Sequence, residues 1–465
     1  MRQNLMMFAL LFSLSFVISG CHAQSNEQQK PNVIILLADD LGWADVGYRG
    51  SDIKTPNLDQ LASEGMRLER FYTNPICTPT RAALMTARDP MKLGVAYAGL
   101  QPWEGGGVSL LEHFMPESFQ AAGYETAMIG KWHLGKSIEQ HTPNARGFDH
   151  FVGHLNTQVD YFTHGVAGGY DLQENGKSIS RKDRYLTDVH AEEAVRFIAE
   201  VRDTSKPFFL YVPFLAPHSP MQATDADKAK YPDRPDRPAP KKTYAAMVDN
   251  MDQAIGKILA SVKSEGLEEN TIILFLSDNG GYQPFGADNQ PLRGGKLSSY
   301  EGGIRVNAVI SWPGEINAGV ENNNVISAQD VMPTLFAATG VERASDRPID
   351  GQNRWAAIKN NAPDVRTGPL FFASNSPIYN RFHVSVIDGD SKLVQVIDHA
   401  NTSTTVNSEL FNLASDPYEK NDLSGEQPAE VERLATMINQ WRAQHPVGGQ
   451  LVSIAPHPGW RAPKD

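Results

Sequence analysis

Four short apolar runs in this chain each end in a cluster of ionisable or amide side chains. The runs span 33–38, 126–130, 208–214 and 272–276, and the clusters after them contain Asp39 and Asp40, Lys131 and His133, His218, and Asp278 and Asn279. Apolar runs without polar alternation are typical of strands buried on both faces, as in a parallel sheet covered by helices. The runs therefore favour a parallel sheet over an antiparallel sheet with one solvated face.

Amphipathic helical patterns lie between these runs. They span 57–65, 108–122, 187–201, 243–264 and 330–339. In the fourth, apolar residues from Met247 to Val262 recur at three- and four-residue spacing, which is the period of a helix with one buried face. Alternating strands and helices predict an open α/β sheet, where ligands bind beyond the carboxyl ends of the strands. All four polar clusters fall at that edge, so we expect them to share one site.

The pattern changes after residue 360. Residues 360–363 are typical of a connector, and 383–387 and 392–397 are typical of short strands joined by a turn at 388–390. A helix should follow, with Val431, Leu434, Ala435, Ile438 and Trp441 on one side. We therefore predict a catalytic domain over 31–362 and a small α+β subdomain over 363–465. The charged, proline-rich stretch 225–242 is interpreted as a surface loop, with a lid as the alternative.

The N-terminus has the pattern of an export signal. Leu5 to Ile18 are apolar apart from two serines, and Arg2 precedes them. A run of this length is short for a membrane span and suits a secretory signal. Small residues before Cys21 resemble a bacterial lipoprotein cleavage site, at which Cys21 would be lipidated; an ordinary cut after Ala23 is the alternative. We expect residues 1–30 to be signal and tether, and the protein to be periplasmic, membrane-anchored or secreted.

Charge and cysteine content exclude several classes of protein. The chain has 42 Lys and Arg against 54 Asp and Glu, a net charge of −12, which argues against a nucleic-acid scaffold that relies on a basic surface. Any attraction of an anionic substrate must therefore be local. The two cysteines are Cys21 and Cys77. If Cys21 carries lipid, Cys77 is left alone, and a solitary cysteine in an exported enzyme calls for a chemical explanation.

Cys77 opens a motif whose geometry favours anion binding. Cys77-Thr78-Pro79-Thr80-Arg81 precedes Ala82 to Thr86, a good helix former, and Pro79 suits a first helical turn. Cys77 should then lie near a helix N-terminus, where free backbone N–H groups and the helix dipole favour an anion. Cys77 and Arg81 are four residues apart, so both side chains would lie on one helix face.

With this motif the sequence resembles the formylglycine-dependent (type I) sulfatases of the alkaline-phosphatase-like superfamily. Cys-x-Pro-x-Arg is the signal in that family for oxidation of the cysteine to an aldehyde by formylglycine-generating machinery. The supporting matches are Asn32-Val33-Ile34 through Asp39-Asp40-Leu41-Gly42, Gly130-Lys131-Trp132-His133-Leu134-Gly135, His218, Ser277-Asp278-Asn279-Gly280, Leu292-Arg293-Gly294-Gly295-Lys296, Glu301-Gly302-Gly303-Ile304-Arg305, Glu409-Leu410-Phe411-Asn412-Leu413 and Asp416-Pro417.

The resemblance covers residues 32 to about 443 in the expected order. It implies a large mixed, mostly parallel sheet sandwiched by helices, with a small C-terminal α+β subdomain. One position departs from the family pattern. Ala87 stands where a glycine commonly follows the threonine of the motif helix, and this puts the end of that helix in doubt.

Asp39, Asp40, Asp278 and Asn279 offer only oxygen atoms as ligands. Such a set suits a hard cation, Ca²⁺ or Mg²⁺, rather than a soft metal. The resemblance implies calcium as the usual ion. Asn279 is also informative because phosphatase-like relatives with two zinc ions commonly carry histidine at that position.

The resemblance also implies a role for each of the other motif residues. Cys77, once converted to formylglycine, would hydrate to a geminal diol, and the cation and Arg81 would hold one hydroxyl ready to attack sulfur. Lys131, His218 and Lys296 would bind the sulfate oxygens, and the last two would donate a proton to the departing alcohol. His133 would then deprotonate the second hydroxyl, which expels sulfate and restores the aldehyde. A thiol has no second hydroxyl and could be trapped as a sulfated adduct.

Several further residues have open interpretations. Asp160, Tyr161 and His164 fall where the substrate loop of the family lies, and Trp103 and Tyr300 could stack on a sugar ring or pack in the core. His190 is interpreted as structural. The favoured function is a sulfuric ester hydrolase acting on an extracellular sulfated oligo- or polysaccharide. The alternatives are a phosphonate monoester or phosphodiester hydrolase of the same superfamily and an inactive glycan-binding lipoprotein.

Overall fold

The computed structural model describes residues 30–167, 169–233, 235, 239–376, 381–398 and 405–446. A ten-stranded sheet forms the centre of this described part of the chain. Its strands, in spatial order, are β12 (Val320–Ser327), β2 (Met66–Tyr72), β11 (Ala308–Ser311), β10 (Thr271–Ser277), β1 (Asn32–Ala38), β9 (Phe208–Pro213), β3 (Glu125–Lys131), β4 (His150–His154), β7 (Gln173–Glu174) and β8 (Lys177–Ser178).

The centre of the sheet is parallel and its flanks are mixed. Strands β10, β1, β9, β3 and β4 run in one direction, whereas β11 and β7 pair antiparallel to their inner neighbours. Within β1, Ile34 and Leu36 belong to one hydrophobic core and Ile35 and Leu37 to the other. Both faces are buried, which explains why the strand has no polar alternation. The mixed, mostly parallel sheet is therefore confirmed.

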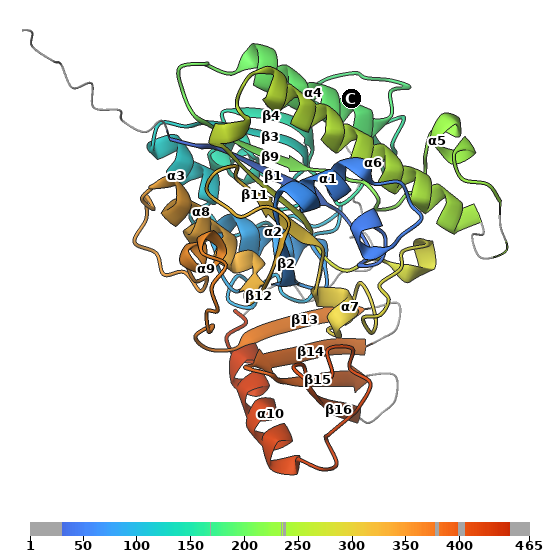
Figure 1. Cartoon of the computed structure of the whole chain (residues 1–465), viewed down its shortest axis with the longest axis vertical. Helices are drawn as coiled ribbons and strands as arrows, with labels where there is room; N and C mark the ends of the chain where they lie inside the picture. The colour runs from blue at the N-terminus through green and yellow to red at the C-terminus, as the bar shows by residue number, and fades with distance from the viewer. Residues whose placement is uncertain are drawn as a thin grey trace, which may run out of the picture.

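Helices cover the two faces (Figure 1). The first core contains residues of α1 (Pro56–Glu64), α4 (Leu186–Arg196) and α6 (Ala239–Ser264). The second core contains residues of α2 (Cys77–Thr86), α3 (Met115–Ala121) and α8 (Val331–Thr339). Shorter elements are α5 (Asp225–Ala229), α7 (Glu301–Ile304), α9 (Trp355–Lys359) and the hairpin of β5 (Gly165–Val166) and β6 (Gly169–Tyr170).

The four apolar runs are strands, and the predictions at 57–65, 187–201, 243–264 and 330–339 are confirmed as helical, with a π-helical turn over Phe197–Val201. Two predictions are wrong in extent. The pattern at 108–122 becomes helical only at Met115, because Pro116 has no backbone N–H and is accommodated in a first turn. The stretch 225–242 is not all loop, since it contains α5 and the first residues of α6.

A second, antiparallel sheet forms the smaller lobe at the bottom of Figure 1. Its strands are β13 (Leu370–Ser376), β14 (Arg381–Asp388), β15 (Ser391–Asp398) and β16 (Thr405–Asn412), and α10 (Pro428–Arg442) packs against β14 and β15. The two strands and the helix expected after residue 363 are confirmed, and β13 and β16 were not foreseen. The boundary at residue 362 stays a prediction.

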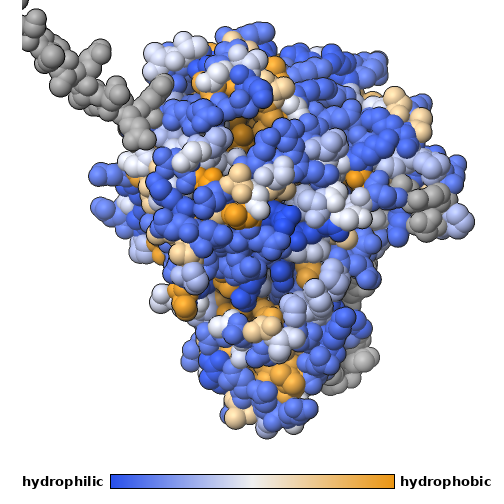
Figure 2. All heavy atoms as spheres, in the orientation of Figure 1, coloured by the Kyte–Doolittle hydropathy of each residue, from blue (hydrophilic) through white to orange (hydrophobic). Residues whose placement is uncertain are grey.

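The outer surface has few features of its own. On the face drawn in Figure 2, hydrophobic residues form separate small groups within a mainly hydrophilic surface. Among the described residues, none of the helices has the length and apolar character needed to cross a membrane. The predicted signal and tether, with Cys21, lie outside the described residues.

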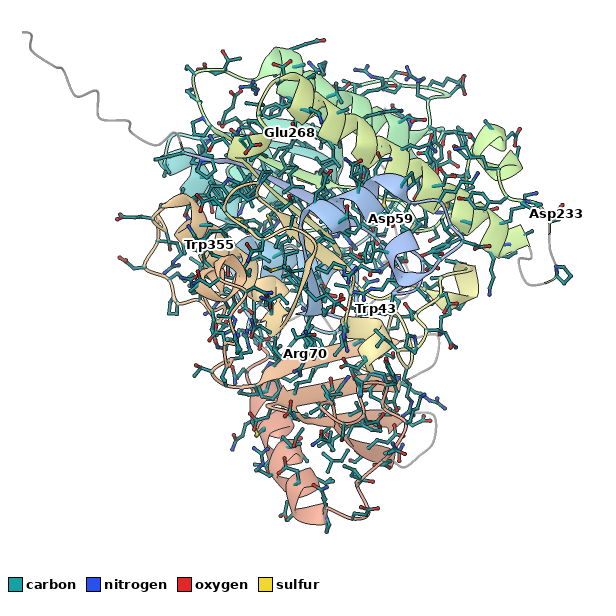
Figure 3. All side chains as sticks on the ribbon, viewed as in Figure 1. Trp43, Asp59, Arg70, Asp233, Glu268 and Trp355 are labelled. Carbon is teal, nitrogen blue, oxygen red and sulfur yellow. The ribbon has the colours of Figure 1, made fainter. Side chains whose placement is uncertain are left out.

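A buried ion cluster joins the two lobes. The Nζ of Lys392 on β15 lies 2.9 Å from a carboxylate oxygen of Glu301 and 2.7 Å from one of Glu419. Glu419 also accepts a hydrogen bond of 2.7 Å from the backbone N–H of Glu301. Nearer the surface, Arg70 lies at the same junction in Figure 3, 4.0 Å from Asp390. Lys392 is therefore the cation on which two buried carboxylates depend.

We expect Lys392→Met to lower the free energy of unfolding by about 3–5 kcal/mol, because it leaves buried carboxylates without their shared partner. Urea unfolding of the purified variant measures this change. The control is Lys257→Met, which breaks a pair with Asp188 whose lysine side chain is 51% exposed, and there the loss should stay under about 1 kcal/mol. Equal losses in the two variants would contradict the prediction.

Helix α2 ends at Ala87 without the glycine that the family pattern has there. Ala87 adopts the left-handed conformation, with φ 54° and ψ 25°, and its N–H donates to the carbonyl of Ala83. The helix therefore stops at the expected position despite the substitution. A left-handed alanine costs about 1–2 kcal/mol relative to glycine, and part of this cost is offset because glycine loses more entropy on folding.

Ala87→Gly should accordingly raise the free energy of unfolding by about 0.5–1 kcal/mol. Gly340 offers the matched reverse change, because it ends α8 with φ 69° and an added Cβ would meet no atom within 4 Å. Gly340→Ala should lower stability by a similar amount in the same denaturant titration. A loss of stability in Ala87→Gly together with a gain in Gly340→Ala would refute the left-handed account of both helix ends.

Candidate active site

The carboxyl ends of four parallel strands bring the predicted residues to one edge of the sheet. Asp39 and Asp40 follow β1, Lys131 ends β3, His218 follows β9, and Asp278 follows β10. The backbone fixes this meeting: the N–H of Asp278 donates to Ala38 at 3.0 Å, and the N–H of Asp39 donates to Ala216 at 3.1 Å. The shared site that the apolar runs predict is therefore present in the structure.

Cys77 is the first residue of α2, and its side chain is buried between a carboxylate and an ammonium group. Its Sγ lies 3.6 Å from Oδ1 of Asp39 and 3.6 Å from Nζ of Lys296. Burial raises the pKa of the thiol to about 12, although Lys131 and Lys296 act in the opposite direction. The unmodified cysteine is therefore a neutral thiol and a weak nucleophile near pH 7.

Arg81, one turn along α2, holds the acidic residues together. Its Nε and Nη2 donate to Asp278 at 3.0 and 2.8 Å, and Nη2 also donates to Asp39 at 3.2 Å. Its Nη1 donates to the carbonyl of Lys131 at 2.9 Å. The guanidinium is fully buried, and it does not line the cavity described below. Its contacts are thus those of a group that positions β1, β3 and β10.

Two lysines complete the balance of charge. Lys131 donates to Asp39 at 2.6 Å, and Lys296 lies 2.6 Å from Oδ1 of Asp40. Burial opposes ionisation of Asp39, but Lys131 and its neighbouring cations hold the pKa of that carboxyl well below its usual range. Burial beside Asp39 raises the pKa of Asp278 to about 6. Lys296 stays charged because Asp40 and its neighbours outweigh burial and raise its pKa.

The two histidines use opposite ring nitrogens. Nε2 of His133 lies 3.0 Å from the carbonyl of Leu100, so this nitrogen carries the proton, and Nδ1 is buried without a hydrogen-bond partner. Nδ1 of His218 lies 2.7 Å from the carbonyl of Ser219, which leaves Nε2 unprotonated 3.8 Å from Asp40. Burial lowers the pKa of both rings, in His218 to about 4 with help from Lys296. Both imidazoles are therefore neutral near pH 7.

A cavity of about 600 Å³ opens above Cys77, within the range of about 300–1,000 Å³ usual for small-molecule sites. Five of the predicted site residues line it, namely Asp40, Cys77, His133, His218 and Lys296. The rest of the described wall comes mainly from loops, with one residue each from β5 and β13, and consists of Ile76, Ala98, Gly99, Gln101, Pro102, Trp103, Thr157, Gln158, Val166, Ala167, Ser219, Tyr282, Phe285, Leu297 and Asn375.

The residues with open interpretations fall into different places. Trp103 lines the cavity, whereas Asp160, Tyr161, His164 and Tyr300 do not. The hydroxyl of Tyr161 donates to the carbonyl of His218 at 2.8 Å, so this tyrosine supports the histidine. His164 is buried against the carbonyl of Arg184, and Tyr300 donates to Glu409. His190 is fully buried, consistent with a structural role.

Most of the cavity wall was not foreseen. Gln158, Tyr282, Phe285 and Asn375 stand in loops or at a strand end, where no periodicity marks them. The only sequence signal for Tyr282 and Phe285 is their closeness to Asn279. Asn375 had no such sequence signal, because it lies on β13 of the second sheet, far along the chain from the predicted site residues.

The acidic cluster has the chemistry of a hard-cation site. Asp39, Asp40, Cys77 and His218 can present ligand atoms within 4.8 Å of one another. Nδ2 of Asn279 donates to Asp40 at 2.7 Å, and its Oδ1 is buried without a partner. An unpaired buried carbonyl oxygen is costly unless something electropositive satisfies it. The residues therefore fit a cation held by carboxylate and amide oxygens, of the class of Ca²⁺ or Mg²⁺.

A family model for sulfatases matches residues 31–341. The chain belongs to the sulfatase family. A second model, described as the C-terminal part of N-sulphoglucosamine sulphohydrolase, matches residues 295–444 of this sulfatase and thus spans the second sheet. Membership of the family makes the protein a sulfuric ester hydrolase.

Named relatives agree with the family. This sulfatase is 33% identical to arylsulfatase J of Mus musculus over 89% of its own length and 76% of that protein. It is 33% identical to N-acetylgalactosamine-6-sulfatase of Rattus norvegicus over 75% and 68%. Among solved structures it resembles Ps i-CgsB in complex with k-i-k-neocarrahexaose, with 34% identity, a TM-score of 0.81 and coverage of 90% and 94%.

We expect calcium to raise the thermal unfolding midpoint of the chelator-treated sulfatase in a concentration-dependent way. A ligand that binds only the folded state at 100 times its Kd stabilises it by about 2.7 kcal/mol. Asp40→Asn should abolish this shift, because it removes one charged oxygen of the set. Parallel titration with magnesium distinguishes the two ions.

The matched control is Asp203→Asn, which changes an exposed carboxylate before β9, at the opposite edge of the sheet. Its calcium-dependent shift should equal that of the wild type. Identical midpoints with and without either ion in the wild-type protein would exclude a cation site at Asp40.

Proposed function

We propose that this sulfatase removes sulfate from an extracellular sulfated glycan, with formylglycine formed from Cys77 as the source of the nucleophile. The observation that carries the proposal is the position of Cys77 at the first turn of α2, at the cavity and within 3.6 Å of both Asp39 and Lys296. A neutral thiol there is a poor nucleophile. Conversion to an aldehyde needs an oxidant, which an external maturation system would supply.

Two groups would add chemistry that the side chains lack. A calcium ion held by Asp39, Asp40, Asp278 and Asn279 would supply positive charge against the oxygens of the sulfate ester and of the nucleophile. The hydrated aldehyde would supply a hydroxyl that attacks sulfur and a second hydroxyl for release of the product.

Lys296 is the best-placed proton donor in the site. Its raised pKa keeps it charged, it lines the cavity, and it lies between Asp40 and Cys77. As the sulfur–oxygen bond breaks, the departing alkoxide would take its proton from this ammonium group. His218, proposed from the sequence as a second donor, is neutral with Nδ1–H directed at Ser219. An anionic sulfate beside its ring would favour protonation of Nε2 and let it share this role.

His133 has the tautomer required of a base. Its proton is on Nε2, so the lone pair of Nδ1 has no hydrogen-bond partner, and the residue lines the cavity. It would take the proton of the second hydroxyl, after which the carbon–oxygen bond to sulfate breaks and the aldehyde is restored. Its low pKa keeps it unprotonated before this step.

Lys131 and Arg81 would mainly neutralise and position the carboxylates of Asp39 and Asp278. Lys131 neutralises Asp39 at 2.6 Å, and Arg81 fixes Asp39 against Asp278. Both side chains are fully buried. Their charge would also stabilise negative charge that develops on the sulfate oxygens in a site of low dielectric constant.

The glycan and its location rest on two kinds of support. The names of the relatives denote an amino sugar sulfate and a complex with a carrageenan oligosaccharide, so a sulfated sugar is the favoured substrate class. The apolar run Leu5 to Ile18 and the small residues before Cys21 support export, with a lipid anchor at Cys21. Family membership favours this reading over a phosphonate or phosphodiester hydrolase, and over an inactive binding protein.

Cys77→Ala should abolish sulfate release, by on the order of 10³-fold or more, because it removes the atom that becomes the nucleophile. The assay measures free sulfate from an aryl sulfate and from sulfated oligosaccharides, using enzyme co-expressed with formylglycine-generating machinery. Mass spectrometry of the tryptic peptide that contains Cys77 should show an aldehyde in the active wild-type protein.

A folding control accompanies this variant. Cys77→Ala should keep the thermal midpoint of the wild type and its response to calcium, because the substitution removes one buried sulfur atom and leaves the four oxygen ligands in place. Normal sulfate release by Cys77→Ala would disprove the role of Cys77. Faster release of alcohol from phosphodiesters than from sulfate esters would reverse the order of the two enzyme hypotheses.

A further inference from the structure

The cavity wall outside the charged cluster carries aromatic side chains. Tyr282 and Phe285 lie in the loop after β10, with their ring centroids 4.9 Å apart and edge to face. Phe285 is 36% exposed, and Trp103 reaches the same cavity from the loop after α2. Phe285 therefore offers a partly exposed aromatic ring on the cavity wall, on which an apolar face of a ligand can pack.

Among the described residues of this wall, none outside the cluster around Cys77 is a cation. Among the described residues that line the cavity, Asp40, Cys77, His133, His218 and Lys296 belong to the cluster around Cys77, and the one further titratable side chain is the phenol of Tyr282. The remaining polar side chains are neutral and include the amides Gln101, Gln158 and Asn375. Lys296 is already paired with Asp40. A second anionic group on a bound sugar would therefore enter the cavity without a partner, which is costly.

The loop that carries Trp103 is fastened to the catalytic residues. Nε2 of His133 donates to the carbonyl of Leu100 at 3.0 Å, and Nζ of Lys136 donates to the carbonyl of Gln101 at 2.9 Å. The ammonium group of this lysine donates to backbone carbonyls of the loop, and the residue does not line the cavity. The neutral wall thus has a fixed position relative to Cys77.

We propose that the cavity binds the sugar ring next to the sulfated one as an uncharged ring, with its C–H face on Phe285 and Trp103 and its hydroxyls on Gln101, Gln158 and Asn375. The inference rests on the proposed function and adds the class of glycan. The preferred substrate carries a neutral sugar beside the ring whose sulfate is removed, rather than a uronate or a second sulfated ring. Apolar C–H groups pack on aromatic faces, and amides form hydrogen bonds with hydroxyls. Neither aromatic nor amide side chains compensate the cost of burying a charge.

Matched oligosaccharides test the charge selection. Each pair shares the sulfated sugar and differs only in the neighbouring ring, which is neutral in one member and carries a carboxylate or a second sulfate in the other. We expect kcat/KM of the wild-type enzyme to be at least about tenfold higher for the neutral member. Gln158→Lys should reduce this preference about tenfold, because it places a cation on the wall.

Truncation tests the aromatic contact. Phe285→Ala should lower kcat/KM on the neutral oligosaccharide at least about tenfold more than on p-nitrophenyl sulfate, mainly through KM, since the aryl ester lacks the neighbouring sugar. Leu111→Ala is the control, because it truncates an apolar side chain that is 74% exposed and does not line the cavity. It should leave both rates unchanged.

The outcomes separate this inference from the function beneath it. Aryl sulfate turnover combined with a preference for the charged oligosaccharide, or with equal losses on both esters in Phe285→Ala, would overturn the inference alone. Failure of the mature wild-type enzyme to release sulfate from any ester would overturn the proposed function and the inference together.

Discussion

The buried ion cluster around Asp39 is the constraint on which the rest of the structure depends. Each ion taken out of water costs several kcal/mol unless opposite charge and hydrogen bonds compensate it. Here Arg81 bridges Asp39 and Asp278, Lys131 neutralises Asp39, and Lys296 neutralises Asp40. Because these side chains come from β1, α2, β3, β10 and a later loop, compensation requires all five segments to meet with defined geometry. The ion pairs that offset the cost of burying these charges also fix the positions of the candidate catalytic groups.

The second sheet completes this arrangement from a distance. The loop that carries Lys296 accepts a hydrogen bond from Ser374 of β13 at the carbonyl of Leu297, and its Arg293 lies 3.0 Å from Glu409 of β16. Glu301 at the end of the loop is bound to Glu419 and Lys392. The Glu409 and Asp416-Pro417 region, noted in the sequence only as a family signature, thus has a physical purpose. It holds in place the loop that carries Lys296.

Sequence patterns succeeded where burial is local and failed where it depends on distant partners. The run 33–38 correctly predicted β1, because the side chains on both faces of that strand are buried in the two hydrophobic cores. The prediction of a helix over 108–122 was too long, because Pro116 favours a first helical turn and the helix begins at Met115. Apolar spacing alone did not show this local signal. Substrate contact by Tyr161 was left open from the sequence, and the structure instead has its hydroxyl donating to the carbonyl of His218, since the path of a loop is not encoded in its spacing. For the same reason Phe285 and Asn375 were missed as cavity residues.

The sequence by itself determined the four central strands, most of the helices that cover them, the types of reactive side chain and the resemblance to the family, because periodicity and short motifs are properties of neighbouring residues. The tertiary structure alone decided which nitrogen of His133 and His218 is free and which acid each lysine neutralises. It also decided that the described part of the cavity wall outside the charged cluster is uncharged and includes aromatic side chains. Those features arise where loops far apart in the chain converge. Their geometry follows from the packing of the whole sheet and from the need to compensate every buried charge, and no local pattern contains that information.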